Sequence, residues 1–164
     1  MAESKEKIKK VSVICAKGSL EDVYAALVMT NGARMEGIEA NIFFTFFGLD
    51  AITKRKMNKL HTATVGNPAM EMPGGLPFPT ILGMLPGVEA GVSAMMRKEM
   101  DKLDIPPVEE FLDMIHAAGG KIYGCKLAVD MFKLKKEDMY DDLEDVITIG
   151  EFYEKAAGGQ IIFT

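Results

Sequence analysis

The sequence contains only two histidines and two cysteines, and this shortage of metal-ligating side chains argues against several function classes. A secreted disulfide scaffold carries more cysteine in a shorter chain, so Cys15 and Cys125 are expected to stay reduced. The two thiols, His61 and His116 do not have the spacing of zinc ligands. We therefore predict no metal site and no bound cofactor.

Long basic runs and nucleotide-binding motifs are missing as well. The net charge is −5 at neutral pH, and no basic stretch is long enough to follow a phosphate backbone, so we expect no nucleic-acid partner. The pattern GxGxxG and the phosphate-loop pattern of P-loop proteins are both absent. Residues Met1–Lys10 are charged and lack the apolar core of a signal peptide, which favours a reducing, cytoplasmic location.

What the sequence does contain is an alternation of apolar strands and helical segments over most of its length. With 164 residues, of which 48% are hydrophobic, residues 1–164 are expected to form one domain around one core. Short runs of β-branched and aromatic residues predict the strands. Five strands are expected, at residues 8–15, 39–47, 121–125, 145–147 and 160–163.

This alternation indicates a doubly wound α/β fold with a mainly parallel sheet and right-handed crossovers. Five strands and this length suit the flavodoxin-like order 2-1-3-4-5, in which the first and third strands are neighbours and the crossover direction reverses between them. Ligands bind beyond the carboxyl ends of the strands at such a point. Cys15 ends the first strand and Cys125 ends the third, so both thiols are expected near one crevice.

The segment around Cys125 carries the strongest chemical signal. A thiol where a strand ends and a helix begins feels the positive end of the helix dipole, which favours the thiolate. Gly124 leaves room for close approach, and Lys126 adds positive charge. A packing role as a small buried side chain is the alternative interpretation for either cysteine. The candidate catalytic residues are Cys125 and Cys15, and the candidate substrate-binding residues are Gly124, Lys126, Lys17 and Gly18, the last two from the turn after the first strand.

Residues 50–60 are predicted to form a short second helix, and an irregular region rich in proline and methionine, at about residues 61–104, follows it. A connection of this length in a compact domain is usually functional or covered by another subunit. Three interpretations remain: a lid on its own core, an oligomer interface with methionine as adaptable filler, or a peripheral membrane contact. A transmembrane span is not expected, because prolines, glycines and Glu89 interrupt the apolar stretch 76–96. Residues 89–102 are predicted to be helical.

Several segments resemble the DsrE/DsrF-like family, in its DsrE-related, peroxiredoxin-like branch. The most specific are the phenylalanine-rich run Ile42–Leu49 and the segment Tyr123–Cys125, and the first strand, the first helix and the insertion are similar too. The resemblance implies a doubly wound α/β subunit that assembles into homo-oligomers. Family members with a cysteine at the position of Cys125 carry sulfur as a persulfide or thiosulfonate. They act with small sulfur carriers, rhodanese-like proteins or disulfide reductases.

The resemblance therefore implies a sulfur carrier or sulfurtransferase-like protein that holds sulfane sulfur on Cys125 and passes it to a partner thiol. Some members have a second cysteine in the preceding helix, whereas Ile115–Ala118 has none here. Transfer to another protein is thus favoured over an internal redox cycle. The alternative function is a non-catalytic binding or assembly module with structural thiols, which docks a partner or a membrane surface through the methionine-rich insertion.

Overall fold

The computed structural model describes residues 7–65, 71–72 and 74–164. Most of the N-terminal segment, residues 1–6, and residues 66–70 and 73 of the predicted insertion lie outside the described residues. All five predicted strands are present and run parallel in one sheet. They are β1 (Lys10–Cys15), β2 (Glu39–Phe44), β5 (Lys121–Cys125), β6 (Asp145–Ile147) and β7 (Gln160–Phe163).

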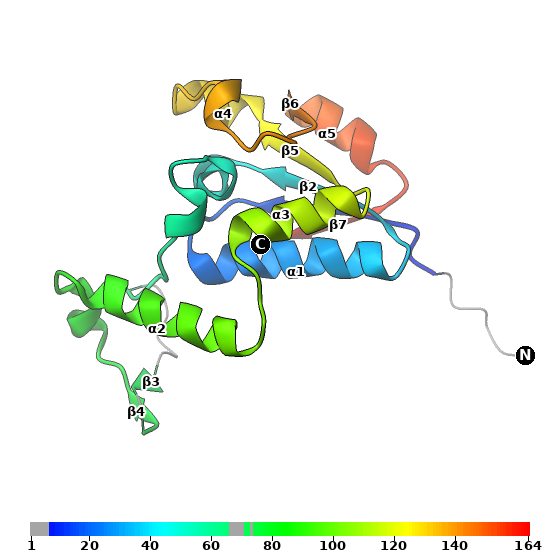
Figure 1. The fold of residues 1–164 in the computed structure, drawn as a ribbon. Helices are drawn as coiled ribbons and strands as arrows, with labels where there is room; N and C mark the ends of the chain where they lie inside the picture. The colour runs from blue at the N-terminus through cyan, green and yellow to red at the C-terminus, as the bar shows by residue number, and fades with distance from the viewer. Residues whose placement is uncertain (1–6, 66–70, 73) are drawn as a thin grey trace, which may run out of the picture.

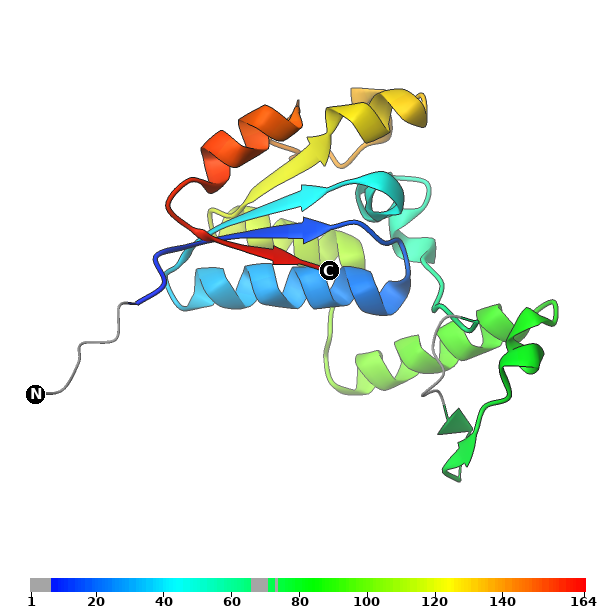
Figure 2. The same ribbon diagram turned by 180° about the vertical axis from the view of Figure 1, so that it is seen from behind.

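Helices cover both faces of this sheet, as Figures 1 and 2 show. Helices α1 (Leu20–Met35) and α3 (Val108–Ala117) pack together on one face, and α5 (Ile149–Ala156) lies on the other. The short helix α4 (Lys126–Met131) follows β5 directly. This arrangement confirms the doubly wound α/β fold with a parallel five-stranded sheet.

The order of the strands differs from the prediction. The sheet runs β6-β5-β2-β1-β7, which is 4-3-2-1-5 in chain order, so the flavodoxin-like order 2-1-3-4-5 is wrong. The central strand is β2, whose consecutive residues Ile42, Phe43 and Phe44 are all buried. A strand that is apolar at every position is stable where helices cover both of its faces, and the centre of the sheet provides this cover. The crossover direction reverses between β1 and β7.

A tight turn after β2 replaces the helix predicted at residues 50–60. Two short 3₁₀ helices, Phe46–Ile52 and Met57–Lys59, fill this region. The first lies against the end of β1, where the Thr45 amide donates to the Cys15 carbonyl (3.0 Å) and the Gly48 amide to the Ala16 carbonyl (3.2 Å). Glycine is needed at position 48 because a Cβ there would lie 2.1 Å from the Cys15 carbonyl oxygen.

The described part of the predicted insertion projects from the α1 side of the molecule (Figures 1 and 2). It contains the hairpin of β3 (Glu71–Met72) and β4 (Leu76–Pro77), a 3₁₀ helix (Thr80–Met84) and helix α2 (Val88–Lys102), which matches the predicted helix. Within the described ranges, no helix is long and apolar enough to cross a membrane.

Candidate functional site

The strand register places the two cysteines on opposite faces of the sheet. Paired residues of adjacent strands share a face, and successive residues of one strand alternate between faces. Tyr123 pairs with Phe43, which packs on α5, so Cys125, two residues later, also faces the α5 side. Cys15 pairs with Phe44, the residue after Phe43, and therefore faces the α1 side.

The central strand β2 also separates the two thiols laterally. Because neighbouring strands lie about 4.8 Å apart, β1 and β5 are about 10 Å from each other. A disulfide requires Cα atoms within about 7 Å, so the fold excludes a bond between Cys15 and Cys125. Both are free thiols. The single crevice predicted for the two cysteines is therefore wrong, because it depended on β1 and β5 being neighbours.

Cys15 is sealed inside the layer between the sheet and α1. Its side chain is fully buried, and burial raises the pKa of the thiol from its ordinary value of 9.0 to about 12. Its Sγ donates a weak hydrogen bond to the Lys17 carbonyl at 3.5 Å. Nucleophilic attack requires the thiolate. These features suit a packing residue.

Cys125 ends β5 and occupies the position before the first turn of α4, as the sequence predicts. That helix has six residues, so its dipole is small. The residue is mostly buried, with 7% of its surface exposed, yet it lines an open cavity of about 840 Å³, here called the Cys125 cavity. Of the two thiols, Cys125 is the one that borders this cavity.

The walls of the Cys125 cavity come from the ends of β1, β2, β5 and β7, from α4 and from the start of α5. The charged lining residues are Lys126 and Asp130, which form an ion pair across one helical turn at 3.2 Å. Most of the other walls are apolar. The aliphatic and aromatic lining residues are Ile14, Phe43, Phe46, Leu127, Ile149, Tyr153, Ile161 and Phe163.

Phe46 forms one wall of the Cys125 cavity, and its backbone conformation is unusual. Its φ is +46°, in the left-handed region that bulky residues rarely adopt. This left-handed conformation at the end of β2 sends two consecutive aromatic side chains to different places. Phe46 lines the Cys125 cavity, and Phe47 lines a second cavity. Sequence reasoning treated both residues as strand and missed their roles. The signal was a pair of phenylalanines directly before Gly48.

Gly124, a predicted substrate-binding residue, faces away from the Cys125 cavity. A Cβ on Gly124 would meet Ile52 at 3.6 Å and Val146 at 3.7 Å, which are ordinary packing distances. These contacts lie on the face opposite to that of Cys125, because consecutive strand residues alternate. Gly124 therefore belongs to the packed interior.

The other two predicted substrate-binding residues, Lys17 and Gly18, line the second cavity, of about 700 Å³, at the start of α1. This cavity is basic, and we call it the basic cavity. Its charged lining residues are Lys17, Arg55, Lys56, Lys59, Asp50 and Glu89, with His61 beside them. Lys126 and Cys125 are thus grouped in one cavity, and Lys17 and Gly18 in another.

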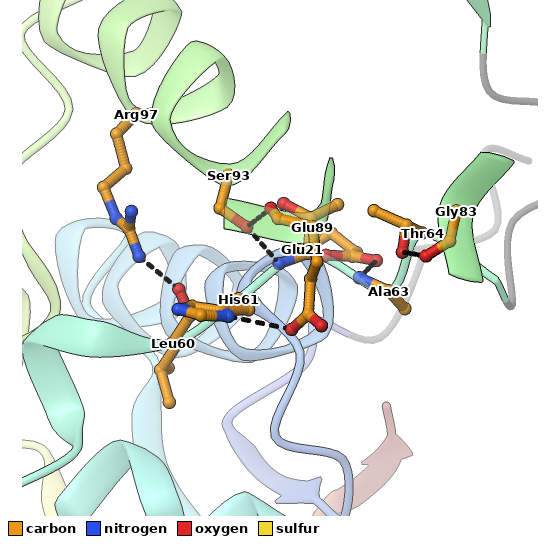
Figure 3. Close-up of polar contacts among 10 residues, drawn as sticks. Glu21, Leu60, His61, Ala63, Thr64, Gly83, Glu89, Ser93 and Arg97 are labelled. Carbon is orange, nitrogen blue, oxygen red and sulfur yellow. Dashed lines mark hydrogen bonds and ion pairs between the residues drawn. The ribbon is translucent and has the colours of Figure 1, made fainter. Parts of the chain in front are cut away.

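The segment Leu60–Thr64, here called the strap, closes one side of the basic cavity and joins α1 to α2 (Figure 3). The His61 carbonyl accepts from the Leu20 amide at 2.9 Å, which anchors the strap to α1. Further bonds are Thr62 amide to Ser93 Oγ (2.8 Å), Ala63 amide to Glu21 Oε1 (3.0 Å), Thr64 Oγ1 to the Gly83 carbonyl (3.2 Å), His61 Nδ1 with Glu89 Oε1 (2.8 Å), and Arg97 to the Leu60 carbonyl.

Within residues 7–65, 71–72 and 74–164, no group of three or more His, Cys, Asp or Glu side chains is arranged to hold a metal ion.

The amino-acid sequence matches a family model described as the DsrE/DsrF/DrsH-like family over residues 7–163. It is 35% identical over 138 residues to a protein named sulfur carrier protein DsrE2 from Allochromatium vinosum, a match that covers 83% of this chain and 86% of that one. It is also 24% identical over 147 residues to the uncharacterized protein YrkE of Bacillus subtilis, covering 85% of this chain and 86% of the relative.

Among solved structures, the fold is similar to the crystal structure of the ychN protein from Escherichia coli. The TM-score is 0.56 with 10% sequence identity, and the match covers 96% of this chain and all of the other. At this identity, the likeness supports the fold alone.

Proposed function

Because the chain belongs to the DsrE/DsrF/DrsH-like family, we propose that it is a sulfur carrier that holds sulfane sulfur on Cys125 and passes it to a partner thiol. The single observation that carries this proposal is the contrast between the two thiols. Cys125 lines a cavity large enough for a donor, whereas Cys15 is sealed in the core. The name of the relative DsrE2 supports the same role.

The chemistry needs two thiol exchange steps. In the first, the Cys125 thiolate attacks the outer sulfur of a donor hydropersulfide, forming an Sγ–S bond while the donor's S–S bond breaks and its thiolate leaves. In the second, a partner thiolate attacks the outer sulfur of the Cys125 persulfide and releases the Cys125 thiolate. Each step moves one sulfane sulfur atom, and no net oxidation occurs.

The second step requires that a partner reach the mouth of the Cys125 cavity. Apolar side chains surround it, including Leu127 (71% exposed), Phe163 (69%) and Tyr153 (61%). Exposed apolar patches of this kind suit a protein interface. The proposed partners are small sulfur carriers, rhodanese-like proteins or disulfide reductases, and a second copy of the chain in a homo-oligomer. A reducing cytoplasm, which keeps the thiol free for each cycle, is the proposed location.

Mass measurement of the intact protein after incubation with a hydropersulfide donor tests the proposal. We expect the mass to rise by one sulfur atom, and to return after addition of an acceptor thiol. The matched variants are Cys125→Ser, which should stay unmodified, and Cys15→Ser, which should load like the wild type. Equal loading of Cys125→Ser and the wild type would rule out Cys125 as the sulfur-bearing residue.

A second candidate function, a binding or assembly module, is favoured by the apolar surface of the projecting insertion. There, Ile81 (73% exposed), Met84 (71%) and Leu76 (62%) face solvent. Such a module uses this surface to dock a partner or a membrane and leaves both thiols inert. Replacing Ile81 and Met84 with serine would abolish its binding while Cys125→Ser would not. For a sulfur carrier, Cys125→Ser would abolish sulfur loading, and replacing Ile81 and Met84 with serine would not.

A further inference from the structure

The Cys125 cavity presents almost no net charge to an incoming molecule. Its two charged lining residues, Lys126 and Asp130, neutralise one another at 3.2 Å. Aliphatic and aromatic side chains from three strands, from Phe46 and from two helices make up most of the remaining surface, and Cys125 itself is mostly buried, with 7% of its surface exposed. The reacting sulfur therefore sits at an apolar wall.

We propose, on the basis of the proposed function, that the sulfur donor of Cys125 is a hydropersulfide whose substituent is uncharged and apolar, and that the Cys125 cavity discriminates against sulfur oxyanions. The inference concerns the substrate class of this site. Hydropersulfides and sulfur oxyanions both offer a reactive sulfur–sulfur bond, and they differ in the charge and polarity of the groups attached to it.

An oxyanion donor such as tetrathionate or thiosulfate must lose water when it reaches Cys125. Burying charge is unfavourable unless the protein supplies opposite charge or hydrogen-bond donors. Among the described residues that line the cavity, the one cation, Lys126, already has a carboxylate partner, and Asp130 repels a dianion. Helix α4 has six residues and is too short to supply a strong anion site at its start.

The basic cavity shows that the chain has a surface suited to anions elsewhere. Lys17, Arg55, Lys56 and Lys59 line that cavity. Of these, Lys17 pairs with Asp22 and Lys56 with Asp50, and within the described residues Arg55 and Lys59 form no ion pair. Cys125 is not among the residues that line it. Of these two cavities, the Cys125 thiol therefore lines the apolar one and not the basic one.

An apolar substituent gains from the same walls that disfavour an anion. Removing one methylene group from water strengthens binding by up to about fourfold. Ile149, Ile161 and Leu127 are each about half or more exposed in the free chain, so a bound alkyl group would cover surface that is otherwise in contact with water. The cavity of about 840 Å³ is large enough for a ligand of drug-like size.

The proposed reaction transfers one sulfur atom. The Cys125 thiolate attacks the outer sulfur of R–S–SH, an Sγ–S bond forms, the S–S bond of the donor breaks, and R–S⁻ leaves. The product, Cys125–S–SH, is small and carries no group other than the transferred sulfur. Tetrathionate would instead release thiosulfate and leave a sulfonate-ended chain on Cys125, which would put a fixed negative charge against apolar walls.

Loading rates of the full-length protein with a series of donors test this inference. The donors are methyl, propyl and pentyl hydropersulfide and tetrathionate, each rate being divided by the rate of the same donor with free N-acetylcysteine. We expect the ratio to rise with alkyl length, by up to about fourfold per methylene. We expect the ratio for tetrathionate to be at least about tenfold lower than the ratios for the alkyl hydropersulfides, which corresponds to about 1.4 kcal/mol. Ratios that are independent of alkyl length and equal for tetrathionate would overturn the inference and leave the sulfur-carrier function standing. If no donor loads the protein, the proposed function itself fails.

Two leucines of matched exposure give the control variants. Leu127 is 71% exposed and lines the Cys125 cavity, whereas Leu103 is 72% exposed and lies outside it. Leu127→Lys should bring the tetrathionate ratio to within about threefold of the propyl hydropersulfide ratio, because it adds a second cation at the wall. Leu103→Lys should keep the wild-type preference. If both variants keep it, charge at the wall does not set the choice of donor.

Discussion

At the scale of single residues, Phe46 has a backbone conformation that its bulky side chain does not favour. With φ at +46°, an L-residue is strained by about 1–2 kcal/mol, and glycine is not. Phe46→Gly should therefore be more stable than Phe46→Ala by about 1 kcal/mol, since both variants lose the same ring and only glycine relieves the strain. Urea unfolding of the two variants measures the difference. If the alanine variant is as stable as the glycine variant, the left-handed conformation is not strained.

The two cysteines should differ sharply in reactivity. Because burial raises the pKa of Cys15 to about 12, almost none of this thiol is ionised at pH 8, and its side chain is fully covered. Titration of the native protein with a thiol reagent should modify one cysteine. The Cys15→Ser variant should react like the wild type and Cys125→Ser should barely react, until denaturant exposes the remaining thiol. Fast labelling of Cys15 in the native chain would contradict this.

The contrast between the cysteines also shows what residue patterns can and cannot reveal. The step from strand to helix at Cys125 was predictable, because an apolar run meets a helical pattern at that residue. The face of the sheet that each thiol occupies was not, because both apolar faces of a buried parallel strand look alike in sequence. The apolar walls of the Cys125 cavity come from distant segments, and no local spacing connects Ile14, Phe46 and Ile149.

At the scale of elements, the strap depends on one buried hydroxyl. Ser93 of α2 is fully buried, accepts from the Thr62 amide at 2.8 Å and donates to the Glu89 carbonyl at 2.7 Å. Ser93→Ala leaves the Thr62 amide without its partner, at a cost of about 1–3 kcal/mol. We expect faster hydrogen exchange at Thr62 and Ala63 and unchanged exchange in β1 and β2.

The control for this change lies on the exposed side of the same helix. Ala94→Ser adds a hydroxyl where solvent can satisfy it, so its effect should stay within about 0.5 kcal/mol and the strap amides should exchange as in the wild type. If Ser93→Ala also leaves their exchange unchanged, the strap is held by its other contacts, such as that between Ala63 and Glu21.

Elements with a local signal were predictable to within a few residues. The five strands were located from β-branched and aromatic runs, and Thr148 and Glu151 form the capping box that starts α5. The 3₁₀ helices after β2 were not foreseen, because the close contact between Gly48 and the Cys15 carbonyl joins segments that are far apart in the sequence.

At the scale of the whole molecule, the strand order was the error with the widest effect. The run Ile42–Phe44 has large apolar residues at consecutive positions, which indicates a strand covered on both faces. The flavodoxin-like order places that strand at an edge, whereas the structure places it at the centre. The central position of β2 separates β1 from β5, and with them the two cysteines.

The stability of the whole molecule should fall in alkaline solution because several buried or partly buried acidic groups are neutral in the folded state. Burial raises the pKa of Cys15 from 9.0 to about 12 and that of Tyr24 from 10.0 to about 12. It also raises the pKa of Tyr140, whose hydroxyl donates to Asp113 at 2.6 Å and is thereby held further in its neutral form. Unfolding releases these groups to their ordinary pKa values.

The sign and the range of this effect follow from proton binding. Between the unfolded and folded pKa values, the folded state binds more protons, so the free energy of unfolding decreases as pH rises. The contribution of Cys15 is complete below pH 9 and is lost by about pH 12, with a slope of up to about 1.4 kcal/mol per pH unit. The tyrosine contributions begin one unit higher, near pH 10.

Urea unfolding at several pH values between 8 and 12 separates the two contributions. The wild type and Cys125→Ser should both lose stability from pH 9 upward. Cys15→Ala should be flatter between pH 9 and 10 and should then follow the tyrosine-dependent decline, because the buried thiol is absent. If Cys15→Ala declines like the wild type from pH 9, the ionisation of Cys15 does not limit alkaline stability, and the burial of this thiol has no measurable electrostatic cost.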